Sequence, residues 1–132
     1  MIKGLVLAAV VGNNVVKEAN SICAGDRQGE FVLRRALPPN RTQHVRAIRR
    51  ELDREGTIQS ELVVLQAPAN YAGPYSLFLH NRQDALAALE RLQRATKEKN
   101  RQDYVDAARV LTQRERFIEH YAAAAGMPAC AF

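Results

Sequence analysis

The chain has 132 residues and a formal net charge of +5, with 47% hydrophobic and 25% charged residues. This length suits one domain with one modest core, and the hydrophobic fraction is too high for a disordered chain of this charge. Only 6% of the residues are aromatic, whereas the helix formers Ala, Leu, Arg, Gln and Glu dominate, so the composition predicts an all-α domain.

An apolar run, residues 5–11, follows Lys3 at the N-terminus. It is similar to the core of a signal peptide, but it is short and two asparagines follow it. It is also well below the roughly 20 apolar residues that cross a bilayer. We expect residues 1–26 to form an apolar arm, helical over about 5–22, that is buried against the domain or against a partner.

Arginine is concentrated between residues 27 and 54, which hold eight arginines and three acidic residues. Outside this block the basic and acidic residues balance at eleven each, so the positive charge is local. A local basic surface indicates an anionic partner, which would be nucleic acid, lipid headgroups or an acidic protein surface. The residues that we expect to bind this partner are Arg34, Arg35, Arg41, Arg46, Arg49 and Arg50.

The block is predicted to form two helices. The first spans residues 30–37 and is stopped by two prolines at 38–39. The second is capped by Asn40 or Thr42 and ends near Gly56, which is a common helix terminator.

The second helix carries a narrow apolar stripe of Val45, Ile48 and Leu52, spaced i, i+3, i+7. This spacing places the three side chains on one face. We therefore expect the stripe to pack inward and the arginines of this helix to point outward.

A short helix over 58–66, capped by Thr57, is expected next, although the apolar run 62–65 would also suit a buried strand. Residues 67–74 are rich in Pro, Gly and Asn and predict a connector. An apolar anchor at 75–79 then precedes the C-terminal region.

Strong helical periodicity follows in two runs, over 81–98 and 102–125, separated by the polar stretch 97–101. The pattern predicts an antiparallel helical hairpin, and one long helix through Asn100 is the alternative. Gly126 should end the last helix. The predicted architecture is therefore a set of short N-terminal helices followed by a long C-terminal helical hairpin.

Cys23 and Cys130 are the only cysteines and form no CxxC pair. We favour two reduced, partly buried thiols because disulfides are scarce in reducing compartments, and a disulfide between the two ends of the chain is the alternative. The histidines His44, His80 and His120 are far apart in sequence, and no catalytic or nucleotide-binding motif occurs. We therefore expect no metal, no cofactor, no small-molecule substrate and no enzymatic activity.

Three stretches in order, residues 33–38, 46–50 and 74–79, resemble the Leu-Arg-Arg-Leu-Pro, Arg-Ile-x-Arg and Pro-Tyr-Leu motifs of a known family. That family is small subunit 7 of the mitochondrial cytochrome bc1 complex, the ubiquinol–cytochrome c reductase binding protein. The chain departs from it in having no tryptophan before the anchor and some thirty additional C-terminal residues. The resemblance implies a non-catalytic, all-α, matrix-side subunit packed on cytochrome b, with its arginines facing acidic subunits or cardiolipin headgroups.

The sequence thus predicts a structural or assembly subunit of a larger, membrane-associated respiratory complex, on the matrix side of the mitochondrial inner membrane. The alternative is a small basic nucleic-acid-binding protein, such as a ribosomal or virion component, in the cytoplasm. Stacking aromatics are absent from the arginine block except for Phe31. This makes nucleic acid the less favoured partner.

Overall fold

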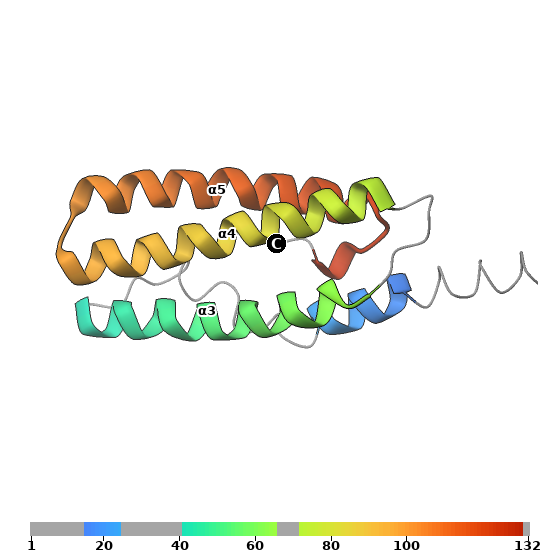
Figure 1. The fold of residues 1–132 in the computed structure, drawn as a ribbon, viewed down its shortest axis with the longest axis horizontal. Helices are drawn as coiled ribbons and strands as arrows, with labels where there is room; N and C mark the ends of the chain where they lie inside the picture. The colour runs from blue at the N-terminus through green and yellow to red at the C-terminus, as the bar shows by residue number, and fades with distance from the viewer. Residues whose placement is uncertain (1–14, 25–40, 66–71, 131–132) are drawn as a thin grey trace, which may run out of the picture.

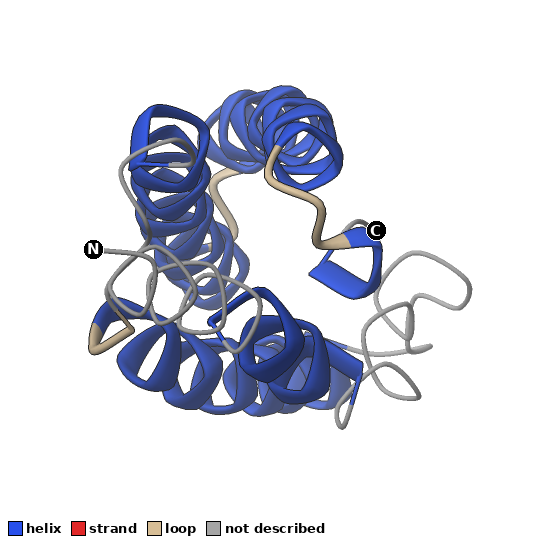
Figure 2. Cartoon of the chain, turned by 90° about the vertical axis from the view of Figure 1, so that its right-hand side faces the viewer, coloured by secondary structure: helices blue, strands red, loops and turns tan. Residues whose placement is uncertain are grey.

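A computed structural model describes residues 15–24, 41–65 and 72–130 of the chain. Residues 15–24 are helical, and α3 (Arg41–Val63), α4 (Ala72–Glu98) and α5 (Arg101–Ala124) run side by side along the long axis (Figure 1). A short 3-10 helix, η1 (Pro128–Cys130), follows. The all-α fold with a long C-terminal hairpin is confirmed, and the described residues contain no strand (Figure 2).

The hairpin is formed by α4 and α5, and the alternative of one continuous helix is wrong. The chain reverses at Lys99, which adopts a positive φ of 56°, and at Asn100. The side-chain oxygen of Asn100 accepts a hydrogen bond from the backbone N–H of Asp103 at 3.1 Å. This cap satisfies a free N–H group of the first turn of α5, so Asn100 begins a new helix rather than continuing the old one.

Helix α4 begins at Ala72, nine residues before the predicted start. The prediction that residues 72–74 belong to a connector is wrong, because Pro74 lies in the first turn of the helix, where a missing N–H costs nothing. Of the predicted apolar anchor, Tyr75 and Phe78 are buried, whereas Leu77 is exposed. The Tyr75 hydroxyl donates a hydrogen bond of 2.5 Å to the carbonyl oxygen of Leu62 and so ties α4 to the end of α3.

Helix α3 continues through Gly56, so the predicted stop at this residue is wrong. Thr57 does not cap a new helix, because it lies inside α3 and its hydroxyl donates to the carbonyl oxygen of Asp53 at 2.9 Å. Beyond it, Ile58 and Leu62 are almost fully buried. Burying these two side chains contributes about 3 kcal/mol or more, which exceeds the roughly 1 kcal/mol that a glycine costs inside a helix.

The buried face of α3 does not coincide with the predicted apolar stripe. Val45 and Leu52 are only half-buried, and Ile48 alone of the three is fully buried. The buried face follows alternating spacings of four and three residues, a heptad-like pattern, through His44, Ile48, Glu51, Glu55, Ile58 and Leu62. Two glutamates and a histidine thus occupy core positions that an apolar stripe does not reveal.

The helix at 15–24 agrees with the prediction of a helical N-terminal arm over the residues that the structure describes. Ala19 and Cys23 of this helix pack into the main apolar cluster with Ile58, Phe78 and Ile118. The rest of the arm, the predicted helix over 30–37 and Arg34 and Arg35 lie outside the described residues.

Cys23 and Cys130 form a disulfide with their Cα atoms 5.0 Å apart, so the expectation of two reduced thiols is wrong. The end of α5 makes this pairing possible. Gly126 has a φ of +75°, its N–H binds the carbonyl oxygen of Ala123 at 3.1 Å, and the N–H of Met127 binds that of Ala122 at 2.8 Å. This pattern is a Schellman motif, which turns the chain back toward the helix at 15–24.

The disulfide should contribute much of the stability, because it closes a loop across 107 positions of the chain. The double variant Cys23→Ser/Cys130→Ser should lose about 4 to 5 kcal/mol of unfolding free energy through greater chain entropy in the unfolded state. Urea denaturation measures this loss. Reduced wild-type protein is the control and should match the variant, and equal midpoints for oxidised and reduced wild type would contradict the prediction.

Gly56 and Gly126 should respond in opposite ways to alanine. A Cβ at Gly56 meets nothing within 4 Å, so Gly56→Ala should stabilise α3 by about 0.5 to 1 kcal/mol. Gly126→Ala should destabilise the protein by about 1 kcal/mol because φ is positive there. Thermal unfolding of both variants tests the pair, and the idea fails if Gly56→Ala lowers the melting temperature.

Candidate functional site

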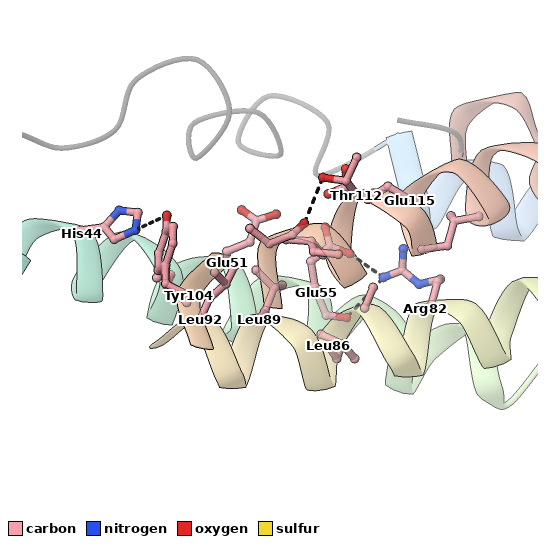
Figure 3. Close-up of a pocket in the computed structure, with 15 residues that line it drawn as sticks. His44, Glu51, Glu55, Arg82, Leu86, Leu89, Leu92, Tyr104, Thr112 and Glu115 are labelled. Atoms are coloured by element: carbon pink, nitrogen blue, oxygen red, sulfur yellow. Dashed lines mark hydrogen bonds and ion pairs between the residues drawn. The ribbon is translucent and has the colours of Figure 1, made fainter. Parts of the chain in front are cut away.

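A cavity of about 170 Å³ lies between α3, α4 and α5 (Figure 3). Its apolar wall includes Ile48 from α3, Leu89 and Leu92 from α4, and Leu111 and Ile118 from α5. Its polar lining consists of His44, Glu51, Glu55, Arg82, Tyr104, Thr112 and Glu115. The cavity is therefore apolar over most of its wall with polar groups from three helices, which is the usual character of a small-molecule site.

Arg82 is the basic residue of this polar lining, and only 4% of it is exposed. Its guanidinium forms an ion pair with Glu55 Oε2 at 2.5 Å and donates to Gln59 Oε1 at 2.9 Å. The guanidinium carbon also lies 5.9 Å from the centre of the Phe78 ring. Arg82 on α4 is thereby fixed against two consecutive turns of α3.

Glu55 uses only part of its hydrogen-bonding capacity. Its Oε2 binds Arg82, whereas Oε1 is buried and has no hydrogen-bond partner in the part of the chain that the structure describes. Glu55 is itself only 5% exposed. One carboxylate oxygen of Glu55 is therefore buried with no donor among the described residues.

His44 and Tyr104 meet at the other end of the cavity from Arg82 (Figure 3). His44 Nε2 lies 2.9 Å from the Tyr104 hydroxyl oxygen, while His44 Nδ1 is buried with no hydrogen-bond partner among the described residues. Burial lowers the pKa of the His44 imidazole from its ordinary value of 6.5, and burial raises the pKa of the Tyr104 hydroxyl. Both side chains are therefore held in their neutral forms near pH 7.

The arginines predicted to bind a partner lie apart from the cavity. Arg41, Arg46, Arg49 and Arg50 are exposed on the first half of α3, as the sequence predicted, and Arg49 pairs with Asp53 at 3.4 Å. No hydrogen bond or ion pair joins Arg41, Arg46 or Arg50 to the rest of the chain that the structure describes. These side chains are available to a partner.

The fold adds a second basic segment to this surface. Because α3 and α4 are antiparallel, the end of α4 and the start of α5 lie beside the first half of α3 (Figure 1). Arg49 and Asp53 line one surface groove together with Glu90 and Arg94 of α4. We call residues 41–54 and 90–103 the basic end.

The basic end carries ten arginines and lysines and five carboxylates, a net charge of +5. The remaining described residues carry five basic and seven acidic side chains, a net charge of −2. Positive charge is thus concentrated at one end of the long axis of the described structure, and the rest carries a small excess of negative charge. Sequence reasoning missed this feature, because residues 90–103 carry a net charge of only +2 (five basic and three acidic residues) and only the fold places them beside α3.

The buried set of Glu51, Glu55 and Arg82 was also missed. The available signal was the spacing of the two glutamates, which share the helical face of Ile48, Ile58 and Leu62. A charged residue in such a face indicates a partner for the buried charge, which is Arg82 of α4 for Glu55 and Arg54 of the same helix for Glu51.

The sequence matches no family model, and neither the curated proteins nor the solved structures gave a match. The resemblance to the subunit 7 family therefore stays a prediction. Among the described residues, no helix is long and apolar enough to cross a membrane. Within the same residues, no group of three or more His, Cys, Asp or Glu side chains is arranged to hold a metal ion.

His44 should make the stability fall in mild acid. Below about pH 6.5 the unfolded chain takes up a proton on this histidine while the folded state resists it, so the unfolding free energy should decrease as the pH falls. His44→Gln should flatten the dependence of the melting temperature on pH between about 6.5 and 5. His120→Gln, at an exposed position on α5, is the control and should keep the wild-type slope. The same slope in all three proteins would contradict the role of His44.

Proposed function

We propose that the protein is a non-catalytic docking subunit that binds an acidic surface of a larger protein assembly through its basic end. The observation that carries the proposal is the juxtaposition of the arginines of α3 with the basic segment joining α4 to α5. Exposed arginines suit protein interfaces, because the planar guanidinium binds carboxylates in a bidentate manner and is weakly hydrated.

The chemistry of the basic end favours a protein partner over nucleic acid. Carboxylates are interspersed among its basic residues, and Asp53 and Glu90 line the same groove as Arg49 and Arg94. A phosphate backbone would be repelled by these carboxylates, whereas a protein surface of mixed charge complements them. Neither segment of the basic end contains Phe, Tyr or Trp for base stacking.

The disulfide indicates the kind of cellular compartment in which this proposed assembly would lie. Stable disulfides form in oxidising compartments and are rare in the cytosol. The Cys23–Cys130 bond therefore supports an oxidising compartment rather than the mitochondrial matrix or the cytoplasm. The bc1 complex remains a candidate only if this subunit lies on its oxidising side.

The proposal is tested with matched charge reversals. Arg46→Glu/Arg50→Glu alters the basic end, and Arg109→Glu/Arg116→Glu makes the same charge change at exposed positions of α5 outside it. In native extracts of the source cell, wild type and the α5 variant should elute in a complex larger than the free chain. The basic-end variant should lose at least about 90% of that fraction, since exchanging two interfacial cations for anions costs several kcal/mol.

Purified protein distinguishes the kinds of partner. Titrations with polyglutamate, a 20-nucleotide RNA and cardiolipin vesicles should rank polyglutamate first, with a loss of binding only in the basic-end variant. Tightest binding to RNA with a steep salt dependence would instead support the nucleic-acid alternative, and tightest binding to vesicles would identify a lipid surface. Elution of the wild type as a free monomer would contradict the docking proposal.

A further inference from the structure

The cavity between α3, α4 and α5 has no role in docking through exposed arginines. Its volume is about 170 Å³, and its wall is mostly apolar. The side chains of Leu86, Leu89 and Leu92 from α4 form one side of this space (Figure 3), and Ile48 of α3 and Leu111 of α5 also line it. A ligand in this space would bury hydrocarbon against all three helices.

The charged side chains of the lining have partners within the protein. Glu55 pairs with Arg82, and Glu51 pairs with Arg54 of the same helix. Glu115, the third carboxylate of the lining, is not without a partner either. An ion that entered the cavity would lose its hydration without meeting an unpaired opposite charge, which is unfavourable. The charges of the lining therefore favour a neutral ligand.

The neutral polar groups of the lining are bonded to one another or to the backbone. The Tyr104 hydroxyl lies 2.9 Å from His44 Nε2, and the Thr112 hydroxyl donates to the carbonyl oxygen of Ala108 at 3.0 Å. Among the described lining residues, the buried atoms without a hydrogen-bond partner are His44 Nδ1 and Glu55 Oε1, and both are enclosed by protein. A buried water typically makes about three hydrogen bonds, so this lining suits hydrocarbon better than ordered water.

The volume limits the ligand to about one six-membered ring. An engineered apolar cavity of about 150 Å³ binds benzene, so about 170 Å³ accommodates roughly six to eight non-hydrogen atoms. Small-molecule sites commonly lie between the helices of a bundle, as this space does.

We propose that this cavity binds a small, neutral, apolar molecule of about the size of a substituted benzene. The ligand contacts Ile48, Leu89 and Leu111 and forms no ion pair with the lining. Its affinity comes from the burial of hydrocarbon surface. The site does not involve the exposed arginines, so it is independent of the docking function.

Toluene is the probe, and benzylamine and benzoate are its cationic and anionic counterparts of similar size. Isothermal titration of the full-length oxidised protein measures the three affinities. We expect toluene to bind with a Kd below about 1 mM and each ion to bind at least about tenfold more weakly. No binding of toluene at about 5 mM, or binding of either ion as tight as that of toluene, would overturn the proposal.

NMR contacts in the wild-type protein locate the probe. Contacts from the toluene ring to the methyl groups of Leu89 and Leu111 are expected, because both side chains line the cavity. Contacts confined to methyl groups outside the cavity would overturn the proposal. This measurement uses no variant, so it tests the site even if a substituted chain does not fold.

Matched variants test the space itself. Ala108→Leu fills the cavity and should abolish toluene binding. Ala87→Leu adds the same side chain at an exposed position of α4 outside the cavity and should bind toluene as the wild type does. Arg46→Glu/Arg50→Glu should lose docking but keep toluene binding, which separates the two functions. Toluene binding that is unaffected by Ala108→Leu would show that the probe binds elsewhere and would contradict the proposal.

Discussion

The buried ion pair between Glu55 and Arg82 fixes the relation of α3 to α4. Arg82 contacts three acceptors on α3, namely the carboxylate and the carbonyl oxygen of Glu55 and the amide oxygen of Gln59. Breaking a buried pair of this kind typically costs about 3 to 5 kcal/mol, because the remaining charge stays buried without a partner. A slip of α3 by one turn would break it, so the pair selects one register of the two helices. Other features of the fold depend on that register.

The register determines which side chains meet at the basic end. With Glu55 beside Arg82, Ile48 packs on Leu89 and Leu92, and Arg49 lines one groove with Arg94. The arginines of α3 thereby lie beside the basic residues of the segment that joins α4 to α5. A one-turn shift would displace α3 by about 5.4 Å and separate these groups. The clustering of positive charge at the basic end therefore depends on a buried contact as well as on the exposed arginines themselves.

The two ends of the described structure differ in the contacts that hold them. The disulfide, the Schellman turn at Gly126 and the larger apolar cluster join the helix at 15–24 to the ends of α3 and α5. Tyr75 reinforces this end through its bond to Leu62, and burial raises the pKa of its hydroxyl to about 12 although Arg82 opposes the shift. The disulfide and the larger apolar cluster thus lie at the end opposite the basic end.

The sequence by itself determined the helical class, the hairpin with its break near Asn100, the end of α5 at Gly126 and the outward position of the arginines of α3. Each follows from local periodicity, capping or backbone conformation, which act over a few residues. Tertiary structure decided the continuity of α3 through Gly56, the burial of Glu51 and Glu55, the Cys23–Cys130 bond and the union of two basic segments. Glu55 and Arg82 lie 27 positions apart, and Cys23 and Cys130 lie 107 positions apart. Local pattern cannot reveal such pairs, because their free energy exists only when the helices are packed.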